Sequence, residues 1–285
     1  KENTDYWNQV DMYVGGQEHA TGHLLYSRFW TNFLYDIGQL SFNEPFKKMK
    51  NQGMILGGDN RKMSKRWGNV VNPDDIVKIY GADTLRVYEM FMGPFDQMLP
   101  WSTESIIGSR RFLEKVWRIG QKVALSKVKE TGKEAEIILQ KTIKKVTEDI
   151  DNFSFNTAIS AMMILANVLE KTDDINQKDF LKFLQILCPF APHLTEELSS
   201  LLGQKKNIVK SSWPSWDQEK VKDDIVKIAV QINGKVRSEI EVGKEATEEA
   251  VKEIALSDLN VKKWLDNKDI KRFIYVPSRV VNIVV

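Results

Sequence analysis

Apolar residues recur at helical spacing from about residue 103 to residue 203, without the alternation that marks strands. A stretch of this length predicts several consecutive helices rather than a sheet, and Pro192 and Gly203 bracket the last of them. The first helix is expected to bury Phe112, Val116, Ile119 and Val123. Antiparallel helices with short connections make a bundle, so we assign residues 103–220 to a helical bundle.

Strand and turn signals come before the bundle. Residues 10–14 alternate as a strand that ends at Gly15-Gly16, a helical pattern follows over residues 24–34, and residues 53–56 form the next short strand. Strand, glycine turn and helix form the local pattern of a nucleotide-binding α/β domain, whose ligands lie beyond the carboxyl ends of the strands. Residues 1–102 are therefore expected to belong to such a domain.

Two helices are expected at the end of this first region. Asn72 can cap a helix that has Pro73 at its first position, and Gly81 ends that helix. Asp83 is expected to cap the next one, over residues 84–92.

A small α/β unit is expected over residues 221–285. After Asp223 the apolar pattern has period two, and Asn233-Gly234 between alternating runs predicts a β-hairpin. A helix over residues 246–255 and a final pair of strands, 274–276 and 280–285, complete it.

Composition limits the class of protein. Of the 285 residues, 42% are hydrophobic and 28% are charged, which excludes a disordered or collagen-like chain, and a net charge of +2 identifies no partner. The single cysteine, Cys188, excludes an intramolecular disulfide and indicates a reducing compartment. No apolar stretch approaches the roughly 20 residues that span a bilayer, so a cytoplasmic protein without a membrane partner is expected.

The chain opens on Lys1, and a strand pattern begins almost at once. This start predicts a chain entered part-way through a domain, and a short frayed terminus is the alternative.

A basic loop precedes the helix that Asn72 caps. Four of the six residues from Arg61 to Arg66 are basic, and Lys62 and Lys65 stand three apart around Met63-Ser64. Two lysines on a mobile loop can neutralise charge that develops on the β- and γ-phosphates when the α-phosphate of ATP is attacked. A solvated basic loop is the alternative for lysines at this spacing.

The loop resembles the KMSKS signature of class I aminoacyl-tRNA synthetases, and its surroundings resemble the leucine, isoleucine and valine subgroup. The residues that carry this resemblance are Lys62-Met63-Ser64-Lys65-Arg66, Asn69-Val70-Val71-Asn72-Pro73, Tyr80-Gly81-Ala82-Asp83-Thr84-Leu85-Arg86 and Pro189-Phe190-Ala191-Pro192-His193-Leu194-Thr195-Glu196-Glu197-Leu198.

Within the subgroup the chain is similar to the carboxyl-terminal half of bacterial leucyl-tRNA synthetases. That likeness rests on Gly15-Gly16-Gln17-Glu18-His19-Ala20, on His23-Leu24-Leu25-Tyr26, on Val230-Gln231-Ile232-Asn233-Gly234-Lys235-Val236-Arg237, and on the ending Tyr275-Val276-Pro277 … Val284-Val285. It implies the second half of a Rossmann-like catalytic domain, an anticodon-binding-type helical bundle that docks tRNA, and a small carboxyl-terminal tRNA-binding domain.

The resemblance also implies the site residues. Lys62 and Lys65 would be catalytic, and ATP would be bound by Gly15, Gly16, Glu18, Met54, Met63 and Ser64. His19 and His23, four apart and so expected on one helix face, would lie beside the leucine pocket, with no protein-bound metal. Without the resemblance, the glycines would be a tight turn, Glu18 a helix-dipole partner and Met54 a core residue, whereas His193 is best explained as structural.

Three departures from the family pattern stand out. Arg66 occupies the fifth position of the signature, where serine is usual. The few residues between Leu56 and Lys62 leave no room for an inserted leucine-specific domain. The stretch His19-Ala20-Thr21-Gly22-His23 resembles the His-x-Gly-His signature, but Ala20 stands where the signature has its first histidine. The first half of the catalytic fold, with that signature and the editing domain, is therefore expected on a missing amino-terminal half or subunit.

Basic residues are candidates for RNA contact. Residues 110–145 hold eleven Lys or Arg against four Asp or Glu. The candidates are Arg110, Arg111, Lys115 and Arg118 in the bundle, with Lys235 and Arg237 beside the hairpin turn. A solvated helix surface is the alternative for the bundle residues. Trp213 and Trp216 could stack on RNA, but packing at a domain interface is the role that the sequence favours.

The sequence thus predicts part of a leucine–tRNA ligase. Its substrates would be leucine, ATP and tRNA(Leu), with Mg²⁺ expected from the family. It would make leucyl-adenylate and transfer leucine to tRNA once the missing half is supplied, and the chain alone would be inactive. A tRNA-binding module without a catalytic role is the alternative.

Overall fold

The structure is a computed structural model that describes residues 6–7, 9–221, 225–243, 246–265, 270–277 and 279–285. Contacts divide the chain into two compact units, Lys1–Asp217 and Gln218–Val285. The end of the first unit lies close to the boundary expected after residue 220. The boundary expected after residue 102 stays a prediction, because helices on its two sides pack together within the first unit. None of the described helices is both long and apolar enough to cross a lipid bilayer.

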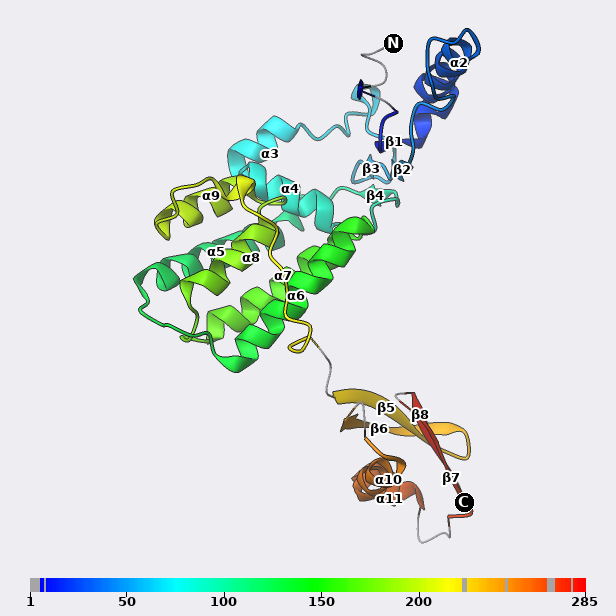
Figure 1. Ribbon diagram of the computed structural model, residues 1–285, viewed down its shortest axis with the longest axis vertical. Helices are drawn as coiled ribbons and strands as arrows, with labels where there is room; N and C mark the ends of the chain where they lie inside the picture. The colour runs from blue at the N-terminus through cyan, green and yellow to red at the C-terminus, as the bar shows by residue number, and fades with distance from the viewer. Residues whose placement is uncertain (1–5, 8, 222–224, 244–245, 266–269, 278) are drawn as a thin grey trace. The chain divides into compact units, whose positions relative to one another are not determined.

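The first unit begins with a parallel βαβ arrangement (Figure 1). β1 (Tyr13–Gly16) pairs in parallel with β2 (Met49–Gln52), and η1 (Gln17–Thr21) and α2 (His23–Asp36) connect them. The position expected for the first strand was wrong, because Val10 forms only an isolated bridge and both glycines lie inside the strand. No local pattern predicts β2, since Met49–Gln52 is largely polar and does not alternate.

The helix α2 leaves most of its apolar side chains in solvent. Among its residues only Leu24 and Thr31 are buried. Leu25, Phe29 and Trp30 expose 58%, 61% and 56% of their surface. An exposed apolar surface of this kind is typical of a face that another polypeptide covers.

A second pair of parallel strands supports the basic loop. β3 (Ile55–Leu56) pairs with β4 (Leu99–Pro100), and η2 (Lys65–Trp67), α3 (Pro73–Tyr80) and α4 (Ala82–Phe91) lie between them in the chain. The strand expected from residue 53 begins only at Ile55. A Cβ at Gly53 would lie 1.8 Å from the carbonyl oxygen of Gln97, so this position requires glycine. The core beneath these elements contains Ile76, Tyr88, Trp101 and Ile106.

The helix α3 begins and ends as predicted. The Asn72 side chain accepts a hydrogen bond from the Asp74 N–H, Pro73 takes the first helical position, and Gly81 ends the helix with φ 90°.

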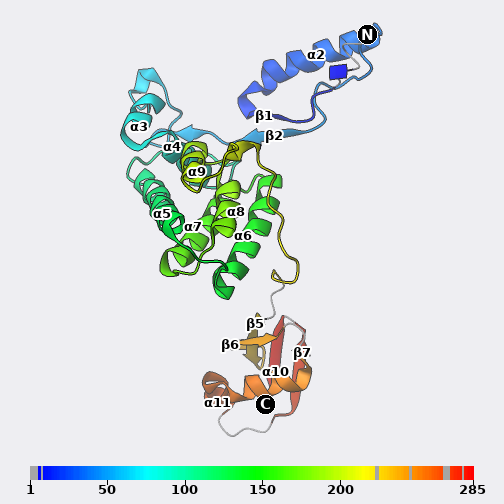
Figure 2. The ribbon, with the colours of Figure 1, turned by 60° about the vertical axis from the view of Figure 1, so that its left-hand side comes forward.

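The helical bundle is confirmed, and Figures 1 and 2 show its helices side by side. They are α5 (Ile106–Leu125), α6 (Lys133–Asp151), α7 (Phe155–Lys171), α8 (Gln177–Leu187) and α9 (Pro192–Leu201). The four residues expected to be buried on α5 are all in the core, at most 5% exposed. After α9, η3 (Ile208–Lys210) leads to Trp213, whose Nε1 donates to Thr147 Oγ1 at 2.8 Å, and Trp216 packs against the bundle core.

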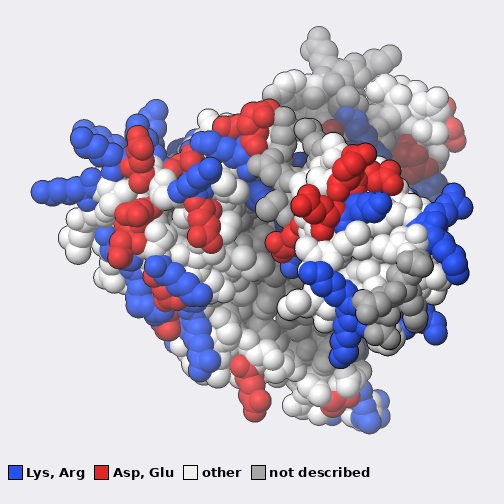
Figure 3. All heavy atoms as spheres, turned by 90° about the horizontal axis from the view of Figure 1, so that it is seen from below, with Lys and Arg blue, Asp and Glu red and all other residues white. Residues whose placement is uncertain are grey.

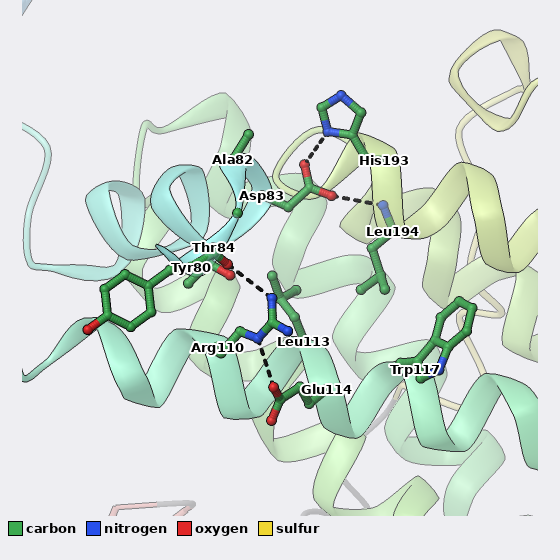
Figure 4. Close-up of a pocket in the computed structure, with 11 residues that line it drawn as sticks. Tyr80, Ala82, Asp83, Thr84, Arg110, Leu113, Glu114, Trp117, His193 and Leu194 are labelled. Carbon is green, nitrogen blue, oxygen red and sulfur yellow. Dashed lines mark hydrogen bonds and ion pairs between the residues drawn. The ribbon is translucent and has the colours of Figure 1, made fainter. Parts of the chain in front are cut away.

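The role expected for Asp83 was wrong. Asp83 lies inside α4, which already begins at Ala82. Its buried carboxylate reaches the start of α9 instead, as Figure 4 shows: the Leu194 N–H donates to Oδ2 at 2.8 Å, and His193 Nδ1 lies 2.8 Å from Oδ1. No side chain next to the start of α9 caps it, so Asp83 supplies that cap from another helix. The structural role expected for His193 agrees with this contact.

The second unit is a four-stranded sheet with two helices. Its elements are β5 (Ile225–Ile232), β6 (Lys235–Gly243), α10 (Glu248–Ser257), α11 (Leu259–Leu265), β7 (Arg272–Val276) and β8 (Val280–Val284), in the strand order β6-β5-β8-β7. The predicted hairpin is present, with φ 50° at Asn233 and 78° at Gly234, as a tight two-residue turn requires. The helix expected from residue 246 begins at Glu248, where Thr247 caps it, and α11 was not predicted.

Replacing Asp83 by alanine should destabilise the first unit. The substitution removes the cap of α9 and leaves the part-buried Leu194 N–H without its acceptor, so we expect the free energy of unfolding to fall by about 1–2 kcal/mol. Urea unfolding followed by helical circular dichroism measures this loss. Asp75→Ala is the control, because Asp75 is exposed in the first turn of α3 and should cost less than about 1 kcal/mol. Equal losses in the two variants would contradict this role for Asp83.

Candidate functional site

The basic loop is closed by one asparagine. Asn69 Oδ1 accepts from the Ser64 N–H at 2.9 Å, and Asn69 Nδ2 donates to Asp59 Oδ1 at 3.0 Å. The same Asp59 oxygen accepts from the Arg61 N–H at 3.1 Å. The hydrogen bond from Asn69 is the main reason that the pKa of Asp59 lies below its usual value. Polar contacts between backbone and small side chains therefore set the shape of the loop, and its cations take no part in closing it.

The two central residues of the signature support the loop from inside. Met63 is half-buried and packs against the small core beneath α3 and α4. The Ser64 hydroxyl accepts from the Arg66 N–H at 3.2 Å and so caps η2. Both side chains serve the local structure, and the ATP contacts expected of these residues stay predictions.

The cationic side chains of the loop point into solvent. Lys62 and Lys65 are exposed, and neither forms an ion pair or side-chain hydrogen bond within the described part of the chain. The Lys62 backbone bridges to Leu56, at the end of β3. The guanidinium carbons of Arg61 and Arg66 lie 5.5 Å and 5.2 Å from the ring centroid of Trp67. Each such contact at an exposed position stabilises the pair by about 0.5–1 kcal/mol.

A cavity of about 400 Å³ brings two predicted ATP-binding residues together. Glu18 from η1 and Met54 from the start of β3 both line it. Gly16 allows this position of Glu18, since a Cβ there would lie 2.1 Å from the Glu18 carboxylate. Because Met54 precedes β3 and Lys62 bridges back to Leu56, the chain joins the cavity directly to the basic loop.

Sequence reasoning missed one ionisable residue of this cavity. Glu89 of α4 also lines it, and burial raises the pKa of its carboxyl. Arg86, on the same helix, pairs with Asp83 at 3.2 Å. The only signal in the sequence was an acidic residue between the apolar residues of Tyr88-Glu89-Met90-Phe91, which does not reveal a cavity.

The two histidines are neighbours but do not share a helix face as expected. His19 lies in η1 and His23 begins α2, with Gly22 between the two helices. Their ring centroids are 6.1 Å apart, and the His23 ring also lies 5.4 Å from that of Tyr13. Both side chains are exposed, and their place beside a leucine pocket stays a prediction.

Three of the four basic candidates on α5 already have acidic partners. Arg110 pairs with Glu114 at 2.7 Å and donates to the Tyr80 carbonyl oxygen. Lys115 and Arg118 each lie 3.0 Å from Glu170, and together they lower the pKa of that carboxyl. Arg111 is exposed, with no ion-pair partner among the described residues. Figure 3 shows acidic side chains among the basic ones over the visible face.

Arg110 also lines a cavity of about 590 Å³ between α4, α5 and α9, which Figure 4 shows. Its walls include Asp83, Leu113, Trp117 and His193. Trp117 is half-buried and packs against the bundle core.

The two candidates of the second unit differ in their surroundings. Lys235 is exposed at the start of β6, next to the hairpin turn. The Arg237 guanidinium carbon lies 3.6 Å from the ring centroid of Trp264 on α11, and 47% of the surface of Trp264 is exposed. A guanidinium held flat on an indole is common in nucleic-acid recognition.

Comparison with known proteins identifies the families that the chain resembles. Residues 6–101 match the family described as tRNA synthetases class I (I, L, M and V), and residues 133–253 match the anticodon-binding domain of tRNA ligase. A leucyl-tRNA synthetase of Agrobacterium radiobacter, solved in a ternary complex with tRNA and LeuAMS, is similar at 34% identity with a TM-score of 0.80. That similarity covers 96% of this chain, which spans 38% of the length of the leucyl enzyme.

Two more distant structures share the fold. Both are methionyl-tRNA synthetases of Mycobacterium tuberculosis bound to methionyl-adenylate, at 20% and 19% identity with TM-scores of 0.52 and 0.55. They cover 69% and 75% of this chain, and the chain covers 45% and 50% of theirs. The expected fold class, a synthetase-type α/β region joined to an anticodon-binding-type bundle, is confirmed.

Replacing Glu89 by glutamine should change how stability depends on pH. The folded-state pKa of Glu89 lies above the unfolded value of about 4.3, so between the two pKa values the folded chain holds more protons than the unfolded chain. The free energy of unfolding therefore falls as the pH rises through the folded pKa, and Glu89→Gln should abolish this fall. We expect the variant to gain stability relative to the wild type at pH 7 more than at pH 4, measured by urea unfolding. A gain no larger than that of Glu104→Gln, at an exposed position before α5, would show that burial of Glu89 is not responsible.

Proposed function

We propose that this chain, which belongs to the class I aminoacyl-tRNA synthetase family, is the part of a leucine–tRNA ligase that binds the phosphates of ATP and docks tRNA. The observation that carries the proposal is the basic loop: Lys62 and Lys65 stand exposed with no counter-ion among the residues that the structure describes, on a backbone that other residues hold in shape. The loop continues directly from the cavity that Glu18 and Met54 line.

The first reaction would be the activation of leucine. The leucine carboxylate attacks the α-phosphate of ATP, a new C–O–P linkage forms, and the bond to the departing pyrophosphate breaks. Negative charge then grows on the β- and γ-phosphates, where Lys62 and Lys65 would neutralise it. Cations without a counter-ion are suited to this task, because no existing ion pair has to break before they act.

The adenosine of ATP would lie in the cavity next to the loop. The Glu18 carboxylate would accept hydrogen bonds from the ribose hydroxyls, and the backbone at Met54 would meet the edge of the adenine. Gly16 supports this geometry, because a Cβ there would meet the Glu18 carboxylate, whereas a Cβ at Gly15 would meet the ring of Tyr13.

The Mg²⁺ expected with ATP has no ready ligand on the loop. Asp59, the acidic residue of the loop, already accepts hydrogen bonds from Asn69 and from the Arg61 backbone. The described loop residues therefore do not fit a protein-bound Mg²⁺ site, and no step is assigned to the ion.

Leucine is the proposed amino acid because of the sequence around η1 and α2. The run from Gly15 to Ala20 and the residues from His23 to Tyr26 carry the likeness to leucyl enzymes, and the leucyl enzyme of Agrobacterium radiobacter is 34% identical over nearly the whole chain. His19 and His23, side by side at the start of α2, would lie beside the leucine side chain.

The activity would require the rest of a leucyl enzyme. The exposed apolar side chains of α2 and the two short two-stranded sheets support a face that another polypeptide segment completes. That segment would bring the His-x-Gly-His signature and an editing domain. Editing is expected because aliphatic side chains that differ by one methylene are separated by only about 1–3 kcal/mol in binding.

Replacing the loop lysines should slow the activation of leucine. Removal of one group that stabilises transition-state charge lowers kcat by about 10²-fold, so we expect a loss of this order for Lys62→Ala and for Lys65→Ala. The assay is leucine-dependent ATP–pyrophosphate exchange, on the chain assembled with the amino-terminal portion of a leucyl enzyme. Lys78→Ala is the control, since Lys78 is an exposed lysine on the neighbouring helix α3. Wild-type exchange in both loop variants would refute the phosphate role.

Replacing Lys235 and Arg237 together should weaken tRNA binding without changing pyrophosphate exchange. Phosphate contacts release counter-ions, so the double alanine variant should bind tRNA(Leu) more weakly and with a shallower salt dependence. Binding at several salt concentrations measures both effects. Lys227→Ala is the matched control, because Lys227 lies on β5 and already pairs with Glu241 at 3.3 Å. A tRNA affinity like that of the control would remove both residues from the RNA surface.

A further inference from the structure

Three residues of the basic loop form a cluster that the proposed activation step does not use. Arg61 and Arg66 both lie over Trp67, and 55% of the surface of Trp67 is exposed. We call these three residues the arginine–tryptophan cluster. Arg66 is also the position at which the loop departs from the family signature, where serine is usual.

The fold does not need this cluster. Asn69 and Asp59 close the loop, Ser64 caps η2, and Met63 anchors the loop in the core beneath it. Trp67 belongs to none of the hydrophobic cores, and Gly68 follows it with φ 64°, which turns the chain away at once. A large indole that is more than half exposed, with two guanidinium groups near its ring, points to a ligand rather than to packing.

We propose that the arginine–tryptophan cluster binds the unpaired 3′ end of the tRNA. This inference rests on the proposed function, because the tRNA end must reach the adenylate before leucine can be transferred. The indole offers a flat face on which an unpaired base stacks, and the two guanidinium groups lie where the adjoining phosphates would pass.

The chemistry of the cluster favours a single strand over a duplex. In a duplex the bases stack on one another, so their faces are closed to an indole and only the phosphates can meet the arginines. The cluster directly follows Lys65, so a strand held there ends beside the lysines that would hold the phosphates of ATP. The two sets of cations thus have different roles. Lys62 and Lys65 act in the activation of leucine, and the arginine–tryptophan cluster binds the tRNA.

The test compares two forms of one tRNA. Trp67→Ala should weaken binding of full-length tRNA(Leu) to the assembled enzyme about tenfold, the effect usual for loss of one base–aromatic stack. It should leave unchanged the affinity for the same tRNA trimmed of its unpaired 3′ nucleotides. Trp67→Phe keeps an aromatic face and should restore most of the loss, whereas Arg66→Ser should reduce the salt dependence of binding to the full-length tRNA alone.

The controls separate this inference from the proposed function. Val70→Ala, at an apolar side chain 49% exposed just after the arginine–tryptophan cluster, should not distinguish the two forms of tRNA. Pyrophosphate exchange should be unchanged in Trp67→Ala. Absence of exchange in the wild-type enzyme would overturn the proposed function, whereas exchange together with equal losses for both tRNAs, or with no loss for either, would overturn the role of the cluster.

Discussion

A buried carboxylate on α4 links the helices that follow the basic loop to the start of α9. Asp83 of α4 is 8% exposed, and it satisfies the start of α9, the His193 ring and the Arg86 guanidinium at once. Because α3 and α4 follow the basic loop directly, this contact holds the loop in a defined place relative to the bundle. Under the proposed function, this link would let a tRNA docked on the bundle present its 3′ end to the adenylate beside the basic loop.

In the basic loop, one set of residues holds the backbone in shape and a different set carries the exposed positive charges. Uncharged or acidic groups such as Asn69, Asp59 and Ser64 shape the backbone, and Met63 anchors it. The lysines take no part in this support and so remain available to phosphates. Two arginines, unlike the lysines, have a partner in the exposed ring of Trp67, and this difference in surroundings is the reason for assigning the two pairs of cations to different substrates.

Helices and strands could be predicted from the sequence wherever a local pattern of residues specifies them. The helices α5 to α9 followed from periodicity, and both the cap at Asn72 and the hairpin at Asn233-Gly234 followed from the conformational preferences of those residues. The strand β2 could not be predicted in this way, because this polar segment becomes a strand only through its pairing with β1. The partner of Asp83 lies 110 residues away in the sequence, and the cavity that Glu89 lines depends on the packing of distant segments. Such features belong to tertiary structure, which a pattern in one sequence does not contain.

The central claim is that this chain supplies the phosphate-binding part of a leucine-activating site that another polypeptide segment completes. The most direct test is leucine-dependent ATP–pyrophosphate exchange by the wild-type chain, alone and after assembly with the amino-terminal portion of a leucyl enzyme. The account predicts exchange from the assembly and none from the chain alone. An assembly that forms and binds tRNA(Leu) but exchanges no pyrophosphate would contradict it, and would indicate a tRNA-binding module without a catalytic role.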